Sequence, residues 1–330
     1  MVLADDRIRV TLLPDRGADI HAIEDLRTGV DVLWKTPWGL HRRGADDLRE
    51  GSAEAWLETY AGGWQVLLPS GGGPSSHRGV HHSYHGEACS LPWAATIVTD
   101  ADSGDRVELR VRLRDSPLLV ERVVSLVPGH SGFDGEVVIT ERVTNESDRP
   151  LEYMWVHHPA FGAPLVAPGV RIRTSASTIL ADPSLDGPGN PLEPGTGYQW
   201  PIVRARDQFD PSGQLDLSVV PPAASGRLLL GYLGGFAEGT ASIENDALDL
   251  ACTLSWDLDV FPYAWLWQEL GATEGPPWLG RAYTIAIEPA TSFPGTGLGG
   301  VVETSATHRI LGAGEAAATR VSLRLSAVRP

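Results

Sequence analysis

Apolar and polar residues alternate with a period of two in many segments of the chain. In Arg106–Arg114 (RVELRVRLR), a valine or leucine at every second position is separated by charged residues. This period is typical of a strand that buries one face. The same alternation recurs from one end of the chain to the other, at Ile8/Val10/Leu12, Val137/Ile139 with Val143, Tyr283/Ile285/Ile287 and Val321/Leu323/Leu325. The pattern predicts a protein built mainly of strands.

Helical patterns are rare. Only Ser52–Ala61 indicates a helix, with Ser52 as the N-cap, Trp56 and Tyr60 four positions apart, and Gly62–Gly63 as the stop. Because strands do not alternate with longer helices, a parallel α/β sheet is disfavoured. We therefore expect an all-β protein, a large antiparallel β-sandwich with few short helices.

A Pro/Gly-rich stretch, Asp182–Gly197, interrupts the strand patterns. Strand patterns resume on both sides, and neither half of the chain has a composition of its own. We interpret the stretch as a long loop inside a single domain that spans residues 1–330.

Charge excludes some classes of partner. The chain has 26 Lys and Arg against 42 Asp and Glu, a formal charge of −16, and Lys35 is its only lysine. This balance argues against nucleic-acid binding, which depends on basic contacts to phosphates. No apolar run approaches the roughly 20 residues of a membrane helix. The N-terminus is acidic where a signal peptide is basic, so we expect a cytoplasmic protein. The oligomeric state is not indicated.

Histidines gather in two places, His77–His85 and His157–His158, which suits either a metal site or an acid/base site. On a strand, His81, His85 and Glu87 would share one face while His82 points away. The second glycine-bracketed histidine of a cupin-like metal set is absent, so no metal or cofactor is expected. A metal-dependent isomerase or hydrolase remains an alternative, with the ligands His81, His82, His85 and Glu87.

Three segments together resemble the galactose mutarotase-like superfamily, which includes the aldose 1-epimerases. They are Gly63–Trp93, Val156–Gly162 and Trp278–Leu298. They carry H-G-[EF]-A at His85–Ala88, H-P-x-F at His158–Phe161, and an E-P ahead of a proline at Glu288–Pro294, in the family's order. The resemblance implies the galactose mutarotase-like supersandwich fold and a carbohydrate-active enzyme, an aldose 1-epimerase (mutarotase).

The same resemblance implies the catalytic residues Glu288, His158 and His85. Glu288 would take the proton of the anomeric hydroxyl while a histidine, best matched by His158, protonates the ring oxygen. The ring opens and recloses as the other anomer without a cofactor. His85 would contact the substrate and share the proton.

Residue alternation supports Glu288 independently of the resemblance. Because Tyr283, Ile285 and Ile287 occupy one face of their strand, Glu288 must lie on the other face. Thr284 and Ala286 on that face are small enough to line a groove. Burial there should raise the pKa of the carboxyl group, which suits a general base.

The expected partner is a small-molecule carbohydrate. Sugars stack their C–H faces on indole rings and exchange hydrogen bonds with polar side chains. The predicted substrate-binding residues are Trp64, Gln65, Arg78, His82, Trp267 and Glu269.

The sequence departs from the family in two places. Classical aldose 1-epimerases carry an Asn-Arg pair upstream of the first histidine, where this chain has Leu68–Gly73. No motif places the family's substrate-binding aspartate, although Asp207, Asp210 and Asp216 lie in the right region. Alternatives are therefore a non-catalytic sugar-binding protein, or a lyase or isomerase that reuses the fold. A phosphorylated sugar would need Arg78, Arg204, Arg206 or Arg281, and a neutral or weakly acidic sugar is favoured.

Overall fold

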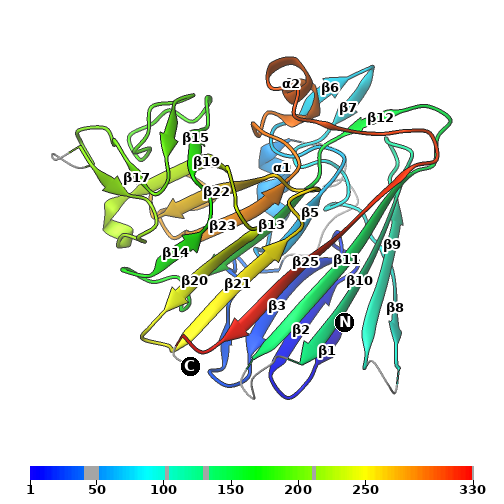
Figure 1. Cartoon of the computed structure of the whole chain (residues 1–330), viewed down its shortest axis with the longest axis horizontal. Helices are drawn as coiled ribbons and strands as arrows, with labels where there is room; N and C mark the ends of the chain where they lie inside the picture. The colour runs from blue at the N-terminus through cyan, green and yellow to red at the C-terminus, as the bar shows by residue number, and fades with distance from the viewer. Residues whose placement is uncertain (41–51, 101–103, 129–133, 210–212, 329–330) are drawn as a thin grey trace.

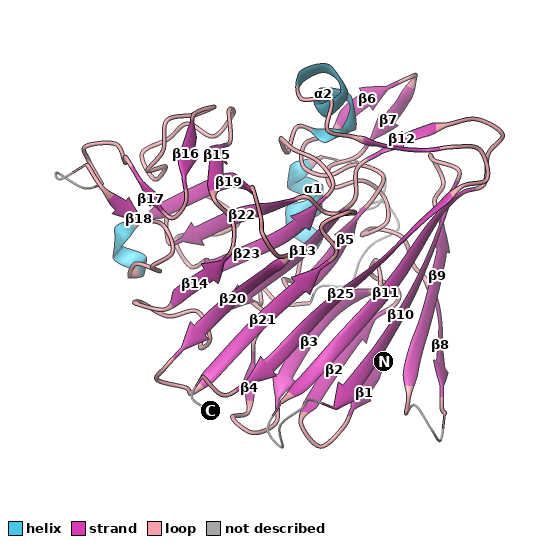
Figure 2. Ribbon diagram, viewed as in Figure 1, coloured by secondary structure: helices cyan, strands magenta, loops and turns pink. Residues whose placement is uncertain are grey.

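Two antiparallel sheets contain most of the strands (Figures 1 and 2). The computed structural model describes residues 1–40, 52–100, 104–128, 134–209 and 213–328. The larger sheet has eleven strands, in the order β1 (Val2–Ala4), β2 (Ile8–Leu13), β3 (Asp19–Asp25), β5 (Trp64–Leu67), β13 (Val156–Gly162), β23 (Tyr283–Ala290), β22 (Tyr263–Leu270), β19 (Arg227–Gly234), β15 (Thr178–Ala181) and β16 (Gly197–Gln199), with β4 (Val30–Asp31) beside β3.

The smaller sheet has eight strands and packs against the larger one. Its order is β14 (Arg171–Thr174), β20 (Thr240–Asn245), β21 (Leu250–Trp256), β25 (Ala316–Ser326), β11 (Gly135–Asn145), β10 (Leu118–Pro128), β9 (Arg106–Arg112) and β8 (Ala94–Val98). Three small two-stranded sheets complete the strands: β6 (Ser75–His77) with β7 (Val80–His82), β12 (Leu151–Tyr153) with β24 (Arg309–Leu311), and β17 (Ile202–Val203) with β18 (Leu215–Asp216).

The predicted all-β sandwich is thus confirmed, and each segment of alternating residues forms a strand. The inward-facing apolar residues of both sheets meet in one inter-sheet core, which includes Val10, Ile139, Ile285 and Leu323. Because neighbouring residues of a strand point to opposite faces, the other face of the eleven-stranded sheet carries a second apolar cluster. This outer aromatic cluster includes Trp34, Trp56, Tyr60, Trp265 and Trp278.

Helices are few and lie outside the sandwich. The predicted helix is present as α1 (Ala53–Thr59), whose N-cap Ser52 accepts a hydrogen bond of 3.2 Å from the amide of Ala55. A second α-helix, α2 (Gly297–Thr304), was not predicted, and a 3₁₀ turn, η1 (Ala223–Ser225), precedes β19. No helix in the described part of the chain is long and apolar enough to cross a membrane.

The glycine content of α2 explains why its residues do not show a helical pattern in the sequence. Three of its first four residues are glycines, which are poor helix formers. The helix packs beside β6 so closely that a Cβ atom at Gly299 would lie 2.5 Å from the carbonyl oxygen of Ser76. The backbones of α2 and β6 lie so close together that glycine is required at Gly299, although glycine disfavours helix formation.

Candidate active site

A cavity of about 430 Å³ lies on the outer face of the eleven-stranded sheet, within the outer aromatic cluster. Its volume is within the range of about 300–1,000 Å³ that is usual for small-molecule sites. Strands β13, β19, β22 and β23 contribute side chains from below, and α1 and the loop around His85 from the sides. The aromatic and titratable side chains that line it are Trp56, Tyr84, Trp265, Trp267, Trp278, His85, His158, Asp182, Glu269 and Glu288.

Glu288 lies on β23 and points into this cavity, as the alternation of the strand predicts. Its neighbours Ile285 and Ile287 pack in the inter-sheet core, whereas Ala286 belongs to the outer cluster. Only 3% of Glu288 is exposed. Burial raises the pKa of its carboxyl group well above the usual value, because a desolvated carboxylate loses the hydration that stabilises its charge.

His158 lies on the adjacent strand β13 and faces Glu288. Its Nδ1 atom is 3.5 Å from Oε1 of Glu288. Its ring is nearly parallel to that of Tyr60, with centroids 5.8 Å apart, and edge-on to Trp267 at 6.0 Å. Burial among these rings lowers the pKa of His158 to about 3, because the imidazolium form would be desolvated.

His85 approaches the same cavity from the loop that follows β7. Its backbone has a φ of +63°, and its ring centroid is 5.6 Å from that of His158. The amide of Gly72 donates a hydrogen bond of 3.0 Å to Nδ1 of His85, and the amide of His85 donates one of 2.9 Å to the carbonyl of Gly72. Since Nδ1 accepts a hydrogen bond here, the neutral ring carries its own proton on Nε2. Burial, with a smaller contribution from His158, lowers the pKa of His85 well below its usual value.

Two further carboxylates line the cavity and are held by hydrogen bonds. Glu269 on β22 accepts hydrogen bonds from the amides of Ala272 and Thr273 at 2.8 and 3.0 Å. Asp182, directly after β15, accepts from the amide and hydroxyl of Ser184 at 2.8 and 2.6 Å. Fixed in this way, each carboxylate presents oxygen atoms to the cavity without needing a cation beside it.

Asp182 was missed as a site residue. It lies at the start of the long loop Asp182–Gly197, whereas the substrate-binding aspartate was expected farther along the chain. The Asp-x-Ser spacing of Asp182 and Ser184 is a signal for a local turn that fixes a carboxylate. Among the three aspartates considered instead, Asp207 and Asp216 do not line the cavity, and Asp210 lies outside the described residues.

Trp267 and Glu269 line the cavity as expected, but four other predicted contacts do not. The predicted substrate contact of Trp64 is wrong. Its indole is buried in the inter-sheet core, where Nε1 donates a hydrogen bond of 3.1 Å to Nδ1 of His157. Gln65 is fully buried behind the cavity wall, where it accepts a hydrogen bond of 3.2 Å from the indole of Trp56. It therefore orients a lining residue instead of reaching a ligand.

Arg78 and His82 belong to the short β6–β7 ribbon, away from the cavity. The side chain of Arg78 is 69% exposed and forms an ion pair of 2.8 Å with Glu152. His82 is buried within the ribbon's packing. Sequence proximity to His85 suggested both contacts, but only His85 lines the cavity.

The alternative metal set does not converge. His81 is exposed, and His85 points into the cavity with its Nδ1 occupied by an amide. Glu87 instead accepts hydrogen bonds from the amides of Arg114 and Asp115 at 2.6 and 3.1 Å. Across the residues that the structure describes, no group of three or more His, Cys, Asp or Glu side chains is arranged to hold a metal ion.

The arginines considered for a phosphorylated sugar also lie elsewhere. None of Arg78, Arg204, Arg206 and Arg281 lines the cavity. Arg206 is held by Glu193 and Asp186 at 3.0 and 2.9 Å. Within the described part of the chain, the cavity wall contains carboxylates and no Lys or Arg.

Solved structures share this fold over nearly the whole chain. The Slr1438 protein of Synechocystis sp. PCC 6803 aligns with a TM-score of 0.67 and 18% identity, covering 99% of this chain and 95% of that one. A galactose mutarotase-like protein of Clostridium acetobutylicum gives 0.66 and 15%, covering 99% and 95%. A provisionally assigned aldose 1-epimerase of Escherichia coli K12 gives 0.64 and 16%, covering 99% and 98%. The chain therefore has the galactose mutarotase-like fold, as its motifs predict.

Sequence comparison assigns the chain to a family. No curated protein matches the chain. The family model described as "Domain of unknown function (DUF4432)" matches residues 1–223 of the 330, and the chain therefore belongs to the DUF4432 family.

Proposed function

We propose that this protein is a carbohydrate-active enzyme of the aldose 1-epimerase type, which interconverts the anomers of a free sugar. The observation that carries the proposal is the buried pair of Glu288 and His158, 3.5 Å apart on the wall of a ligand-sized aromatic cavity. Ring opening of a sugar needs a proton acceptor and a proton donor at two neighbouring oxygen atoms, and this pair supplies both.

The pair works with one shared proton. In the empty cavity the raised pKa of Glu288 and the lowered pKa of His158 place that proton on the carboxyl group. The form with Glu288 ionised and His158 protonated has the same total charge. The pair therefore passes from one form to the other by moving the proton from Glu288 to His158, without taking up an ion. This second form is the reactive one.

In the reactive form, Glu288 takes the proton of the anomeric hydroxyl as the carbonyl forms at C1. The bond between C1 and the ring oxygen breaks, and His158 gives its proton to that oxygen. Rotation about the C1–C2 bond and the reverse transfers close the ring as the other anomer. Protons and electrons balance within the sugar and the pair, so the step needs no redox partner. His85 donates from Nε2 to a substrate oxygen and orients the sugar.

The remaining wall suits a neutral sugar. Trp265, Trp267 and Trp278 offer faces for stacking on C–H groups. Asp182 and Glu269 accept hydrogen bonds from sugar hydroxyls, since both carboxylates are already fixed by other donors. The carboxylates of Asp182 and Glu269, with no lining Lys or Arg as far as the structure describes the wall, would repel a phosphate or another carboxylate.

Anomer exchange on a panel of neutral aldoses, followed by NMR saturation transfer, tests the proposal. Wild-type protein should accelerate exchange for at least one aldose, and Glu288→Gln should lower that rate by about 10²–10⁴-fold. Glu303→Gln, at an exposed position of α2, is the matched control and should leave the rate unchanged. Binding of a sugar by the wild type without exchange would instead favour a non-catalytic sugar-binding protein.

A further inference from the structure

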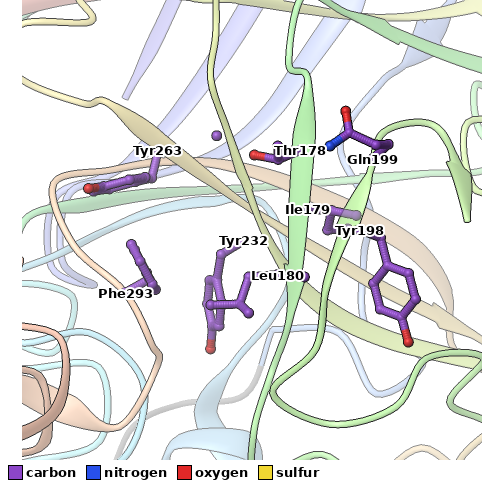
Figure 3. A pocket seen from close by; sticks show the side chains of 10 residues that line it. Thr178, Ile179, Leu180, Tyr198, Gln199, Tyr232, Tyr263 and Phe293 are labelled. Carbon is purple, nitrogen blue, oxygen red and sulfur yellow. The ribbon is translucent and has the colours of Figure 1, made fainter.

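A second cavity, of about 380 Å³, lies on the same face of the eleven-stranded sheet as the candidate active site. It is built where β15, β16, β19 and β22 run side by side, toward the sheet edge that β16 forms. Figure 3 shows its aromatic wall, in which Tyr263 and Phe293 stand beside Tyr232 and Leu180. No step of the proposed reaction uses this cavity.

Its aromatic rings are held in place by one another. Phe293 stacks on Tyr232 with centroids 5.6 Å apart, and Tyr263 meets Phe293 edge-on at 4.7 Å. Such rings offer apolar faces at a low cost in conformational entropy. A flat, partly apolar ligand such as a pyranose ring matches this surface.

The polar groups around these rings are uncharged and available. Thr178 and Gln199 occupy paired positions on β15 and β16, on the cavity face, and Tyr263 lines the cavity from β22. None of these three side chains has a hydrogen-bonding partner among the described residues. The described lining contains no Asp, Glu, Lys or Arg. A ligand here therefore gains hydrogen bonds from neutral donors and acceptors and needs no charge.

Gly234 forms an opening between these groups. A Cβ atom at this position would lie 3.5 Å from Oγ1 of Thr178 and 3.9 Å from Cδ1 of Tyr263, both ordinary contact distances. The missing side chain therefore leaves ligand-accessible space between the hydroxyl of Thr178 and the ring of Tyr263. It also offers a position where a larger side chain can fill the cavity without strain.

Tyr232 is the wall between the two cavities. Its ring lines the second cavity, while its hydroxyl donates a hydrogen bond to Asp182 and accepts one of 2.7 Å from the amide of Gly295. Asp182 and Gly295 both line the candidate active site. The ring of Tyr232 in the second cavity is thus linked, through its hydroxyl, to the Asp182 carboxylate in the candidate active site.

We propose that the second cavity is a separate carbohydrate-binding site that takes one neutral pyranose unit, stacked on Tyr263, Phe293 and Tyr232. Thr178 and Gln199 exchange hydrogen bonds with its hydroxyls. The proposal goes beyond the anomer exchange at Glu288 and does not depend on it, because the second cavity contains none of the groups of that reaction.

Two glycine variants separate the sites. Gly234→Leu fills the second cavity, and Gly73→Leu fills the first, where a Cβ atom would meet nothing closer than 3.8 Å. Gly187→Leu is the matched control, since it lines neither cavity and a Cβ atom there meets nothing within 4 Å. The probe is methyl β-D-galactopyranoside, whose ring cannot open. Hydrogen–deuterium exchange mass spectrometry locates the bound probe, and saturation-transfer NMR measures its affinity.

The probe should protect residues 178–180 and 197–199 from exchange in the wild type, in Gly73→Leu and in Gly187→Leu, and not in Gly234→Leu. Tyr263→Ala should weaken that binding by about tenfold, which gives a second reading if Gly234→Leu does not fold. Protection confined to the first cavity, or no protection at all, would overturn the proposal. A change of oligomeric state in Gly234→Leu without loss of binding would do the same, because it would assign the groove at β16 to contact between copies.

Discussion

His157 and His158 are adjacent in the chain, yet their rings lie on opposite faces of β13. His158 faces the cavity, 3.5 Å from Glu288, while His157 is fully buried in the inter-sheet core with Nε2 2.8 Å from Glu141. Glu141 also contacts Nε of Arg122 at 2.5 Å. Strand β13, which carries His158, therefore also contacts the buried ion pair of Arg122 and Glu141 in the eight-stranded sheet.

Loss of Arg122 should destabilise the protein strongly. Arg122 and Glu141 are both buried, and Arg122→Met would leave an uncompensated carboxylate in the core. Removing one partner of a buried pair typically costs about 3–5 kcal/mol, so we expect a loss of that size in the free energy of unfolding. Urea denaturation monitored by tryptophan fluorescence measures it.

The neighbouring pair of Arg320 and Glu136 is the control. Arg320 is 55% exposed and lies 3.1 Å from Glu136. Exposed pairs contribute about 0–1 kcal/mol, so Arg320→Met should be nearly neutral. Equal losses for Arg122→Met and Arg320→Met would contradict the buried-charge argument. The double change Arg122→Met with Glu141→Leu should recover part of the loss, because no unpaired carboxylate remains.

His85 offers a test of substrate orientation that separates chemistry from folding. Its φ of +63° is a left-handed conformation that asparagine tolerates well. His85→Asn should therefore fold, but it removes the Nε2 donor. One hydrogen bond to a charged or polarised oxygen accounts for about 1.5–3 kcal/mol, so kcat/KM for anomer exchange should fall by about 10- to 100-fold.

Arg78→Asn is the control for that change. Arg78 also has a positive φ, +48°, but its side chain is exposed and paired with Glu152. Its substitution should leave kcat/KM unchanged. A loss comparable to that of His85→Asn would restore Arg78 as a substrate contact, as the sequence analysis expected.

Strand positions and strand faces could be predicted because burial acts on each residue locally. An apolar residue at every second position reports directly which face meets the core, and this placed Glu288 opposite Ile285 and Ile287. The capping serine of α1 is equally local, because Ser52 bonds within its own first turn. Such features need no knowledge of the remaining chain.

The partners across the cavity could not be predicted in the same way. Trp64 was expected to contact the substrate and Trp56 only to form part of a helix, yet Trp64 packs in the inter-sheet core and Trp56 lines the cavity. Only the pairing of β5 with β13 and the docking of α1 decide between them. Asp182 reaches the cavity because β15 pairs with β19, a relationship between segments about 50 residues apart. Its role depends on register, which composition and spacing do not specify.

Glu288→Gln should become more stable than the wild type as the pH rises above about 4.5, while it slows exchange. Because burial raises its pKa in the folded state, Glu288 binds its proton more tightly there than in the unfolded chain, where the pKa is near 4.5. Stability is therefore lost as the pH rises from about 4.5 through the folded-state pKa. Glutamine is neutral at every pH, so its advantage over wild type in urea denaturation should grow over this interval. A pH-independent difference would contradict the buried ionisation of Glu288.

The pH profile of anomer exchange should be unusually broad on its acid side. Activity needs the Glu288–His158 pair to hold one proton, so it falls when a second proton binds or when the first is lost. Burial lowers the pKa of His158 to about 3, so the second proton binds far below the usual histidine range. The alkaline limb follows the raised pKa of Glu288. We expect kcat/KM not to fall as the pH is lowered from about 7 to about 5, in protein shown to be folded by circular dichroism. An acid limb near pH 6.5 would mean that His158 titrates as an exposed histidine, and the shared-proton mechanism would then fail.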